Sequence, residues 1–151
     1  METNTASSAS ESGKKKSFAR FLPHIARILM GLPFFVGGLN WFFHFFPEPN
    51  PQLPEGAAAF TEALMKSGYM MDLIMGTQLI VGTLLLLNRF VPLALALIAP
   101  FLVNAMAFHI FLERSGLPFA SVFVALELYL TWSYRNAFRP MLSMRTKPGA
   151  K

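Results

Sequence analysis

The 151-residue sequence contains no cysteine and few charged residues. The absence of cysteine excludes disulfides, thiolate metal sites, CxxC redox motifs and S-palmitoylation. Charged residues make up 14% of the chain, against about 25% in a typical soluble domain, whereas 54% of the residues are hydrophobic. The sequence also shows no phosphate-binding loop, nucleophile motif or nucleotide fingerprint. These features indicate a single domain that is surrounded by lipid.

Four apolar stretches are long enough to cross a bilayer. A hydrocarbon core about 30 Å thick needs about 20 apolar residues in a helix, because a helix satisfies its own backbone polar groups in lipid. The predicted spans are residues 25–46, 69–87, 92–112 and 118–134. The fourth is the weakest, since Glu127 lies near its middle, where an acid is costly. We therefore predict an all-α integral membrane four-helix bundle whose fourth helix inserts against the other three.

The distribution of basic residues predicts the orientation of the chain. Of the 13 Lys and Arg residues, only Lys66 and Arg114 fall on one side of the predicted spans, and the others fall on the opposite side. Because positive flanks stay in the cytoplasm, both termini are expected there. The net charge of +5 thus comes from basic residues that are expected to anchor the ends of the spans, and nucleic acid is not expected as a partner.

Outside the spans, the sequence predicts two tails and one longer loop. Residues 1–17 are polar and are predicted to form a disordered cytoplasmic tail, residues 18–142 the transmembrane domain, and residues 143–151 a basic cytoplasmic tail. The loop between the first two spans begins with prolines and then predicts a short interfacial helix over 57–66, covering the outer mouth of the bundle. Pro92 and Pro118 suit first helical turns, whereas Pro33 and Pro100 should kink their spans.

Polar side chains at membrane depth are the candidate site residues, because they normally face the bundle interior. At a rise of about 1.5 Å per residue, Gln78, Asn104 and Glu127 come to one level near mid-membrane, where they are expected to form a hydrogen-bonded cluster. Asn40 lies somewhat further out, and His44 and Asp72 fall near the outer interface with His109. We predict an outward-facing polar pocket floored by Glu127. Its candidate ligand-binding residues are Asn40, His44, Gln78, Asn104, His109 and Glu127.

Simpler interpretations of these residues stay open. Glu127 can serve as a neutral or amide-paired acid that fixes helix register. His44 and His109 can serve as hydrogen-bonding anchors near the interface. No metal site is expected, since no two potential ligands within a span have the spacing of the His-bearing motifs of bundle metal sites.

Several segments resemble the DoxX family of small bacterial four-helix membrane proteins, over most of the chain from His24 to Leu142. They are residues 26–40 with Gly37-Gly38-Leu39-Asn40, residues 60–69, 76–82 and 86–94, Asn104 with His109, and Glu127 with Tyr134-Arg135. The resemblance implies a multi-pass protein of the bacterial inner membrane. It also implies an association with quinol oxidase, thiosulfate:quinone oxidoreductase or oxidative-stress redox systems, or, in distant relatives, with transport. Gln78 stands where relatives carry Glu, which argues against proton handling at that position.

Three functions follow as hypotheses. The leading one is a binding or accessory subunit whose pocket holds a quinone or another lipid-soluble molecule beside membrane redox proteins or a second copy of the chain. The second is a quinone-linked oxidoreductase that uses His44, His109 or Glu127 for proton transfer. The third is a small transporter or a structural membrane partner. No cofactor is evident in the sequence beyond a possible quinone or lipid.

Overall fold

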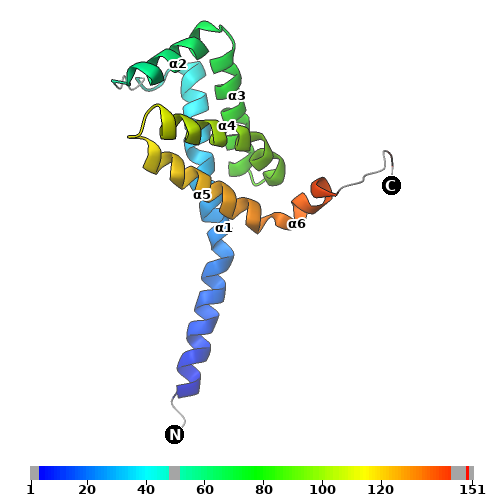
Figure 1. The fold of residues 1–151 in the computed structure, drawn as a ribbon. Coiled ribbons are helices and arrows are strands. Elements are labelled where there is room, and N and C mark those ends of the chain that lie inside the picture. The colour runs from blue at the N-terminus through cyan, green and yellow to red at the C-terminus, as the bar shows by residue number, and fades with distance from the viewer. Residues whose placement is uncertain (1–3, 48–51, 144–148, 150–151) are drawn as a thin grey trace.

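The computed structural model describes residues 4–47, 52–143 and 149, with side chains from residue 21 onward. Within these residues the fold is all-α, as predicted (Figure 1). The elements are α1 (Asn4–Phe43), α2 (Glu55–Lys66), α3 (Met70–Leu86), α4 (Val91–Phe111), α5 (Leu117–Ser133), α6 (Arg135–Phe138) and the 3-10 turn η1 (Arg139–Leu142).

Helices α1 and α3 pack closely because glycines remove side chains from their contact. A Cβ atom on Gly82 would lie 2.7 Å from the Cα of Phe35 and 2.8 Å from the carbonyl oxygen of Gly31. A Cβ atom on Gly38 would lie 2.8 Å from the carbonyl oxygen of Met75. Small residues allow helix backbones to approach in lipid, where association depends largely on packing. The α1–α3 pair therefore depends on glycine in both helices.

The buried core joins this pair to α4 and α5. Its fully buried side chains come from all four helices, so each helix contributes to one continuous core. They are Met30, Val81, Leu85, Leu95, Ile98 and Leu130.

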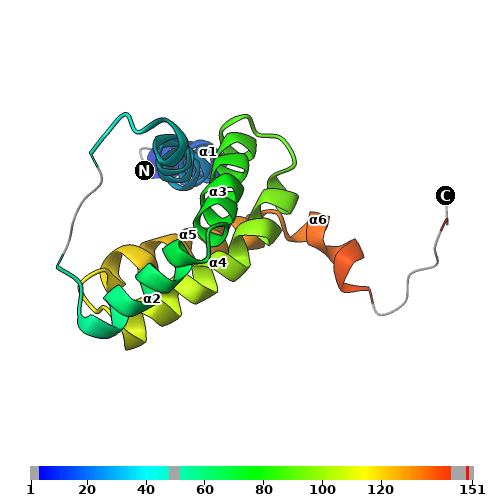
Figure 2. The ribbon, with the colours of Figure 1, turned by 90° about the horizontal axis from the view of Figure 1, so that it is seen from above.

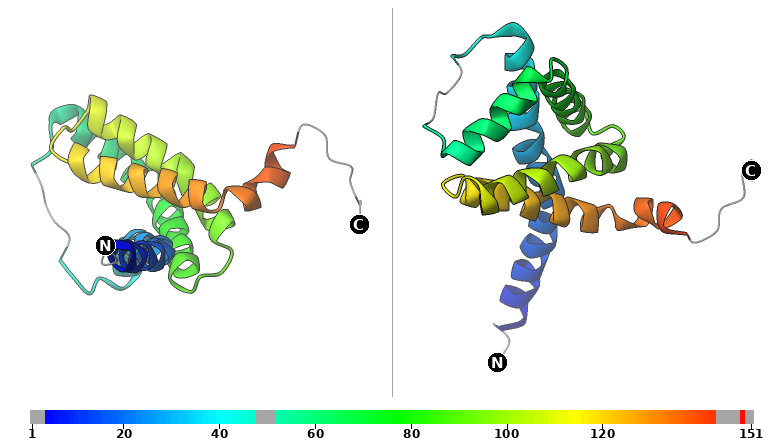
Figure 3. Two further views of the ribbon diagram at one scale, coloured as in Figure 1. Left: turned by 90° about the horizontal axis from the view of Figure 1, so that it is seen from below. Right: turned by 45° about the horizontal axis from the view of Figure 1, so that its top comes forward.

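The α4–α5 hairpin runs across α1 instead of alongside it. Seen from above, α1 is viewed nearly end-on while α4 and α5 are seen lengthwise, and the views of Figures 1 and 3 agree (Figures 1, 2 and 3). The connection before α4 contains two residues with left-handed backbone, Asn88 (φ 56°) and Phe90 (φ 51°). Their positive φ angles turn the chain sharply between α3 and α4. This arrangement differs from the predicted bundle of alternating antiparallel helices.

The described residues contain two to four candidate membrane spans. Phe21–Phe43 within α1 and Val91–Phe111 are each long and apolar enough to cross a membrane. Helices α3 and α5 have 17 residues each, about 25 Å of helix against a core of about 30 Å. Two further spans arise only if each bent pair counts as one: α2 with α3, bent by 89°, and α5 with the segment Arg135–Leu142, bent by 75°.

The outer faces of the helices carry large apolar side chains. Leu73, Val103 and Phe119 are each at least 60% exposed, and many other Leu, Phe and Ile side chains are exposed as well. A soluble monomer rarely shows so much continuous apolar surface. Lipid is the medium that such a surface suits.

The predicted interfacial helix is present as a helix, and an aromatic pair joins it to α4. Helix α2 begins at Glu55, and its Phe60 ring packs against the ring of Phe108 with centroids 5.7 Å apart. Pro92 and Pro118 lie in first turns, as predicted. Pro33 and Pro100 lie inside continuous helices.

The ends of the chain leave one prediction open. Helix α1 begins at Asn4, inside the tail that the sequence predicts to be disordered over 1–17. Most of the predicted tail at 143–151 lies outside the described residues. The division into two tails and a domain over 18–142 stays a prediction.

Candidate ligand-binding site

Two cavities lie on either side of α4 and share a wall. The first, of about 240 Å³, is lined by residues of α2, α3 and α4, and the second, of about 250 Å³, by residues of α1, α3, α4 and α5. Gln78, Phe101, Ala105 and His109 line both. The last three recur at intervals of four along α4 and thus form one stripe on its surface. This stripe, with Gln78 from α3, is the partition between the cavities.

The walls are mainly aliphatic and aromatic. Phe101 is held by Phe34, whose ring it meets edge-on with centroids 6.1 Å apart, and Phe34 also packs on Phe123 at 5.2 Å. Few polar side chains interrupt these walls. They are Gln78 and His109 in both cavities, with Asn104 and Thr61 added in the first.

The polar side chains of the partition differ in how they are bonded. Gln78 is 8% exposed, and its amide makes no hydrogen bond to another described residue. Asn104 is exposed and likewise has no such bond. The Thr61 hydroxyl donates to the carbonyl oxygen of Ala57 at 2.9 Å, so its proton is used within α2. The two amides are therefore the groups left to bind a ligand, together with His109.

His109 is held by Glu113, in the turn between α4 and α5. Nδ1 of His109 lies 2.9 Å from the carbonyl oxygen of Glu113 and 3.1 Å from its Oε2. The same carboxylate accepts from the backbone N–H of Ser115 at 2.7 Å, from the Ser115 hydroxyl and from the N–H of Gly116 at 3.0 Å. The His109 ring packs against Gly116, where a side chain would collide with it. The turn thus holds the imidazole ring in place and occupies its Nδ1 atom with hydrogen bonds.

These hydrogen bonds keep Glu113 ionised. The Ser115 hydroxyl, with the N–H groups of Ser115 and Gly116 and the His109 ring, lowers the pKa of the Glu113 carboxyl from 4.5 to about 2, against an opposing effect of desolvation. Hydrogen bonds to the charged form outweigh burial here. The histidine at the cavity wall therefore faces a permanent anion at neutral pH.

Asn40 lies in the last turn of α1 and His44 follows the helix directly, and neither residue lines either cavity. The Asn40 amide donates to the carbonyl oxygen of Phe46 at 3.2 Å, and the N–H of Phe46 donates to Oδ1 of Asn40 at 2.7 Å. His44, the residue after the end of α1, has a left-handed backbone (φ 53°). The two residues share a helix end, and their predicted ligand-binding role stays a prediction.

Glu127 is buried on α5 and lines neither cavity. The Thr131 hydroxyl donates to its Oε1 at 3.4 Å, and its Oε2 has no partner among the described residues. Neither cavity is floored by Glu127, and no described hydrogen bond joins it to Gln78 or Asn104. The predicted mid-membrane cluster assumed parallel helix axes, whereas the α4–α5 hairpin crosses α1. Three of the six candidate residues, Gln78, Asn104 and His109, meet at the first cavity.

The sequence did not predict the hydrogen bonds that two charged side chains, Glu113 and Arg27, make in the structure. Glu113 lies just outside the predicted span 92–112, although its spacing of four from His109 is a signal that the sequence contains. Arg27 was treated as a membrane anchor, yet it is 6% exposed and donates a hydrogen bond to Oδ1 of Asn88. The described residues contain no group of three or more His, Cys, Asp or Glu that would hold a metal ion.

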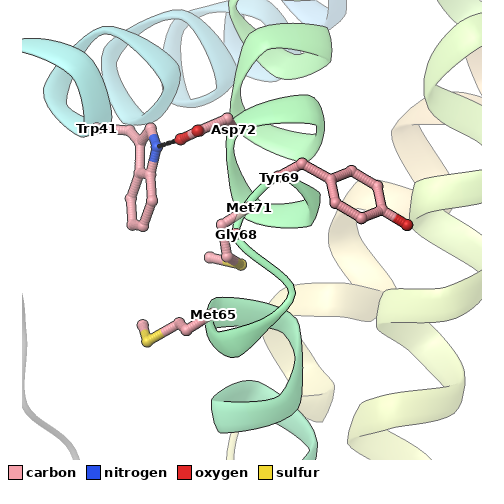
Figure 4. Close-up of a pocket in the computed structure, with 6 residues that line it drawn as sticks. All are labelled: Trp41, Met65, Gly68, Tyr69, Met71 and Asp72. Atoms are coloured by element: carbon pink, nitrogen blue, oxygen red, sulfur yellow. Dashed lines mark hydrogen bonds between the residues drawn. The ribbon is translucent and has the colours of Figure 1, made fainter.

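A third, smaller cavity of about 90 Å³ lies where α1 meets the bend between α2 and α3 (Figure 4). The indole N–H of Trp41 donates to Oδ1 of Asp72 at 2.8 Å, joining the end of α1 to the start of α3. Met65 and Met71 complete the wall, while the Tyr69 side chain points away from Trp41 (Figure 4). This cavity is too small for a substituted ring, and the Trp41–Asp72 bond across it links α1 to α3.

Comparison with known proteins identifies the family of this membrane protein. The model of the DoxX family matches residues 22–110, from α1 to nearly the end of α4. No curated protein and no solved structure matches the chain. The matched segment includes Gln78, Asn104 and His109 and ends before Glu113. With the matched segment covering more than half of its length, the chain belongs to the DoxX family.

Proposed function

We propose that this DoxX-family protein is a binding or accessory subunit of a membrane redox system, and that its paired cavities hold the ring of a lipid-soluble molecule such as a quinone. The single observation that carries the proposal is the shared partition of Gln78, Phe101, Ala105 and His109. Small-molecule sites are mostly apolar with a few convergent polar groups, as these walls are.

The size of the cavities limits what they take. Each is about 240 to 250 Å³, somewhat below the roughly 300–1,000 Å³ of sites for drug-sized molecules. A single substituted ring is therefore the expected occupant, with any long apolar tail lying outside among the exposed apolar side chains. This is the build of a quinone and of several other membrane lipophiles.

The available polar atoms suit oxygen substituents on a ring. The amides of Gln78 and Asn104 can each donate and accept hydrogen bonds, and neither is used by another described residue. A ligand that hydrogen-bonds to the amide of Gln78 gains the net free energy of that bond. The sequence carries no flavin, haem or thiol signal, which favours a subunit that holds a molecule for redox partners.

The membrane arrangement that goes with this function has four crossings and cytoplasmic termini. In it, α1, α3, α4 and α5 each cross the bacterial inner membrane, and α2 lies at its outer face. Support comes from the basic residues: Lys66 and Arg114 are the two that fall outside the cytoplasmic flanks.

Extraction of the purified protein tests the proposal. The protein is isolated in native lipid, and bound small molecules are extracted and identified by mass spectrometry. We expect a quinone or a related lipophile at near-stoichiometric amounts in the wild type and a strong loss in Gln78→Leu. Gln52→Leu is the matched control, since Gln52 is exposed and lines neither cavity. Recovery of no lipophile, together with an unchanged melting temperature when quinone is added, would overturn the proposal.

A second candidate function is favoured by the His109–Glu113 pair. A histidine oriented by a carboxylate at a cavity wall is suited to proton transfer, so the chain would be a quinone-linked oxidoreductase in its own right. Turnover by the isolated chain, lost in His109→Phe, would establish this. No turnover without a partner protein leaves the accessory role.

A further inference from the structure

The bonding of His109 determines which of its ring nitrogens carries the proton. Nδ1 is within hydrogen-bond distance of two groups, the carbonyl oxygen of Glu113 at 2.9 Å and the Oε2 atom of its side chain at 3.1 Å. A carbonyl oxygen only accepts hydrogen bonds, and so does an ionised carboxylate. Nδ1 must therefore be the donor, and the neutral imidazole has its single proton there.

The carboxylate is well placed to stay ionised in this role. Three donors point at it besides the histidine: the N–H and hydroxyl of Ser115 and the N–H of Gly116. With a pKa of about 2, the Glu113 carboxyl carries no proton near neutral pH. It cannot reverse the hydrogen bond by donating to Nδ1.

The other nitrogen is left for a ligand. When Nδ1 carries the proton of a neutral imidazole, Nε2 holds a lone pair and accepts a hydrogen bond. Nε2 of His109 has no partner among the described residues, and the ring lines both cavities. While the ring is neutral, His109 therefore offers one acceptor beside the amides of Gln78 and Asn104, which can act either way.

We propose that the turn at Glu113 holds His109 as a hydrogen-bond acceptor toward the cavities, so that the site selects a ring that carries a hydroxyl over one that carries a carbonyl. For a quinone ligand this means that the reduced hydroquinone form binds more tightly than the oxidised form. The inference rests on the proposed function, since it concerns the same cavities. It adds a selectivity that cavity shape does not supply.

Other charged groups lie on the elements around His109, and none of them is bonded to it within the described residues. Glu62 pairs with Lys66 at 2.6 Å, Asp72 accepts from Trp41, and Glu127 accepts from Thr131. Glu113 is thus the charged group that bonds to the imidazole. Arg27 of α1 donates to Asn88, and the other charged or titratable groups nearby include Glu55 on α2, His24 on α1 and Arg114 in the turn after α4.

A ligand series tests the selectivity on the unaltered protein. Binding of a short-chain benzoquinone, its hydroquinone and the di-O-methyl ether of that hydroquinone is measured without oxygen at about pH 8, where an ordinary imidazole is neutral. We expect the hydroquinone to bind roughly two- to tenfold more tightly than the quinone, the value of one net hydrogen bond. The ether, which has no donor, should bind no better than the quinone.

Matched histidine variants locate the effect. In His109→Phe, the ratio of hydroquinone affinity to quinone affinity should fall close to one, while the affinity for quinone changes little. His44→Phe removes a histidine that lines neither cavity and should keep the wild-type ratio. If the quinone binds as tightly as the hydroquinone or more tightly in the wild type, the inference is overturned and the proposed function stands. If no member of the series binds, both are overturned.

The proton position has its own measurement. Nitrogen-15 NMR of histidine-labelled protein distinguishes a protonated Nδ1 from a protonated Nε2, and the signal lost in His109→Phe assigns the residue. We expect a protonated Nδ1 and an unprotonated Nε2. A neutral ring protonated at Nε2 would contradict the proposal without any ligand.

Discussion

The guanidinium of Arg27 in α1 donates a hydrogen bond from Nη1 to Oδ1 of Asn88, in the turn between α3 and α4. Arg27 is buried, and its Nε atom has no partner among the described residues. Asn88 stands in the left-handed region, which asparagine tolerates better than most residues. One bond thus joins a buried cation to the turn that sends the α4–α5 hairpin across α1.

Substitution of Asn88 should separate the hydrogen bond from the backbone conformation. Asn88→Gly keeps the left-handed turn but leaves Arg27 without its acceptor, and we expect a loss of about 1–3 kcal/mol in unfolding free energy. Asn88→Ala should cost roughly 1 kcal/mol more, because alanine resists positive φ. Unfolding in detergent micelles measures both. Arg89→Ala, at the exposed neighbouring position, is the control, and equal stability of Asn88→Gly and this control would contradict the assignment.

The glycine contact between α1 and α3 gives a sharper comparison. Gly38→Ala places a Cβ atom 2.8 Å from backbone atoms of Met75 and Leu79, and we expect overpacking to cost about 1–3 kcal/mol. Gly37→Ala meets nothing within 4 Å and should be neutral or stabilising by up to about 1 kcal/mol, because alanine favours helix. Thermal melting of the two variants measures the difference. A Gly38→Ala protein as stable as Gly37→Ala would show that the helices do not pack as described.

The turn at Glu113 should make stability depend on pH in the acid range. The folded-state pKa of Glu113 is lowered from 4.5 to about 2, so its contribution is fully present above pH 4.5 and is lost as the pH falls toward 2. We expect Glu113→Gln to melt below the wild type at pH 6, with the gap narrowing as the pH falls through this window. Ser115→Ala, which removes the strongest of the donors, should show a smaller pH dependence than the wild type. A gap that is constant from pH 6 to 2 would contradict the assignment.

The proposed topology can be read by chemical labelling, because the chain has no cysteine of its own. Single cysteines at Glu62 and Ser143 both lie at exposed positions, and neither substitution changes the number of basic residues that orients the chain. With four crossings and cytoplasmic termini, Glu62→Cys should react with a membrane-impermeant maleimide in intact cells and Ser143→Cys should not. Labelling of both, or of Ser143→Cys alone, would refute this orientation.

The elements of the fold were predictable because hydropathy and helix signals act locally. The apolar runs predicted the long helices, Pro92 and Pro118 marked first turns, and Phe60 and Leu64 indicated the short helix α2. The crossing of the α4–α5 hairpin over α1 was not predictable in the same way. It depends on positive φ angles at Asn88 and Phe90, and phenylalanine carries no sequence signal for such a backbone.

The grouping of the candidate residues could be predicted less well than the helices. Counting depth along straight helices put Gln78, Asn104 and Glu127 at one level and His109 near the outer interface, whereas Gln78, Asn104 and His109 line the first cavity and Glu127 does not. The spacing of four indicates that His109 and Glu113 can pair, but the bonds that the Glu113 carboxylate accepts from Ser115 and Gly116 depend on the turn after α4.

Since the two cavities share Gln78, Phe101, Ala105 and His109, a ligand in one would contact side chains that also line the other. Phe101 and Gln78 each belong to both walls, so a guest that displaces either toward one side enlarges its own space at the expense of the other. Occupancy on one side of α4 would then alter affinity on the opposite side by an equal and reciprocal factor. The two cavities thus form one binding region whose halves share the same side chains.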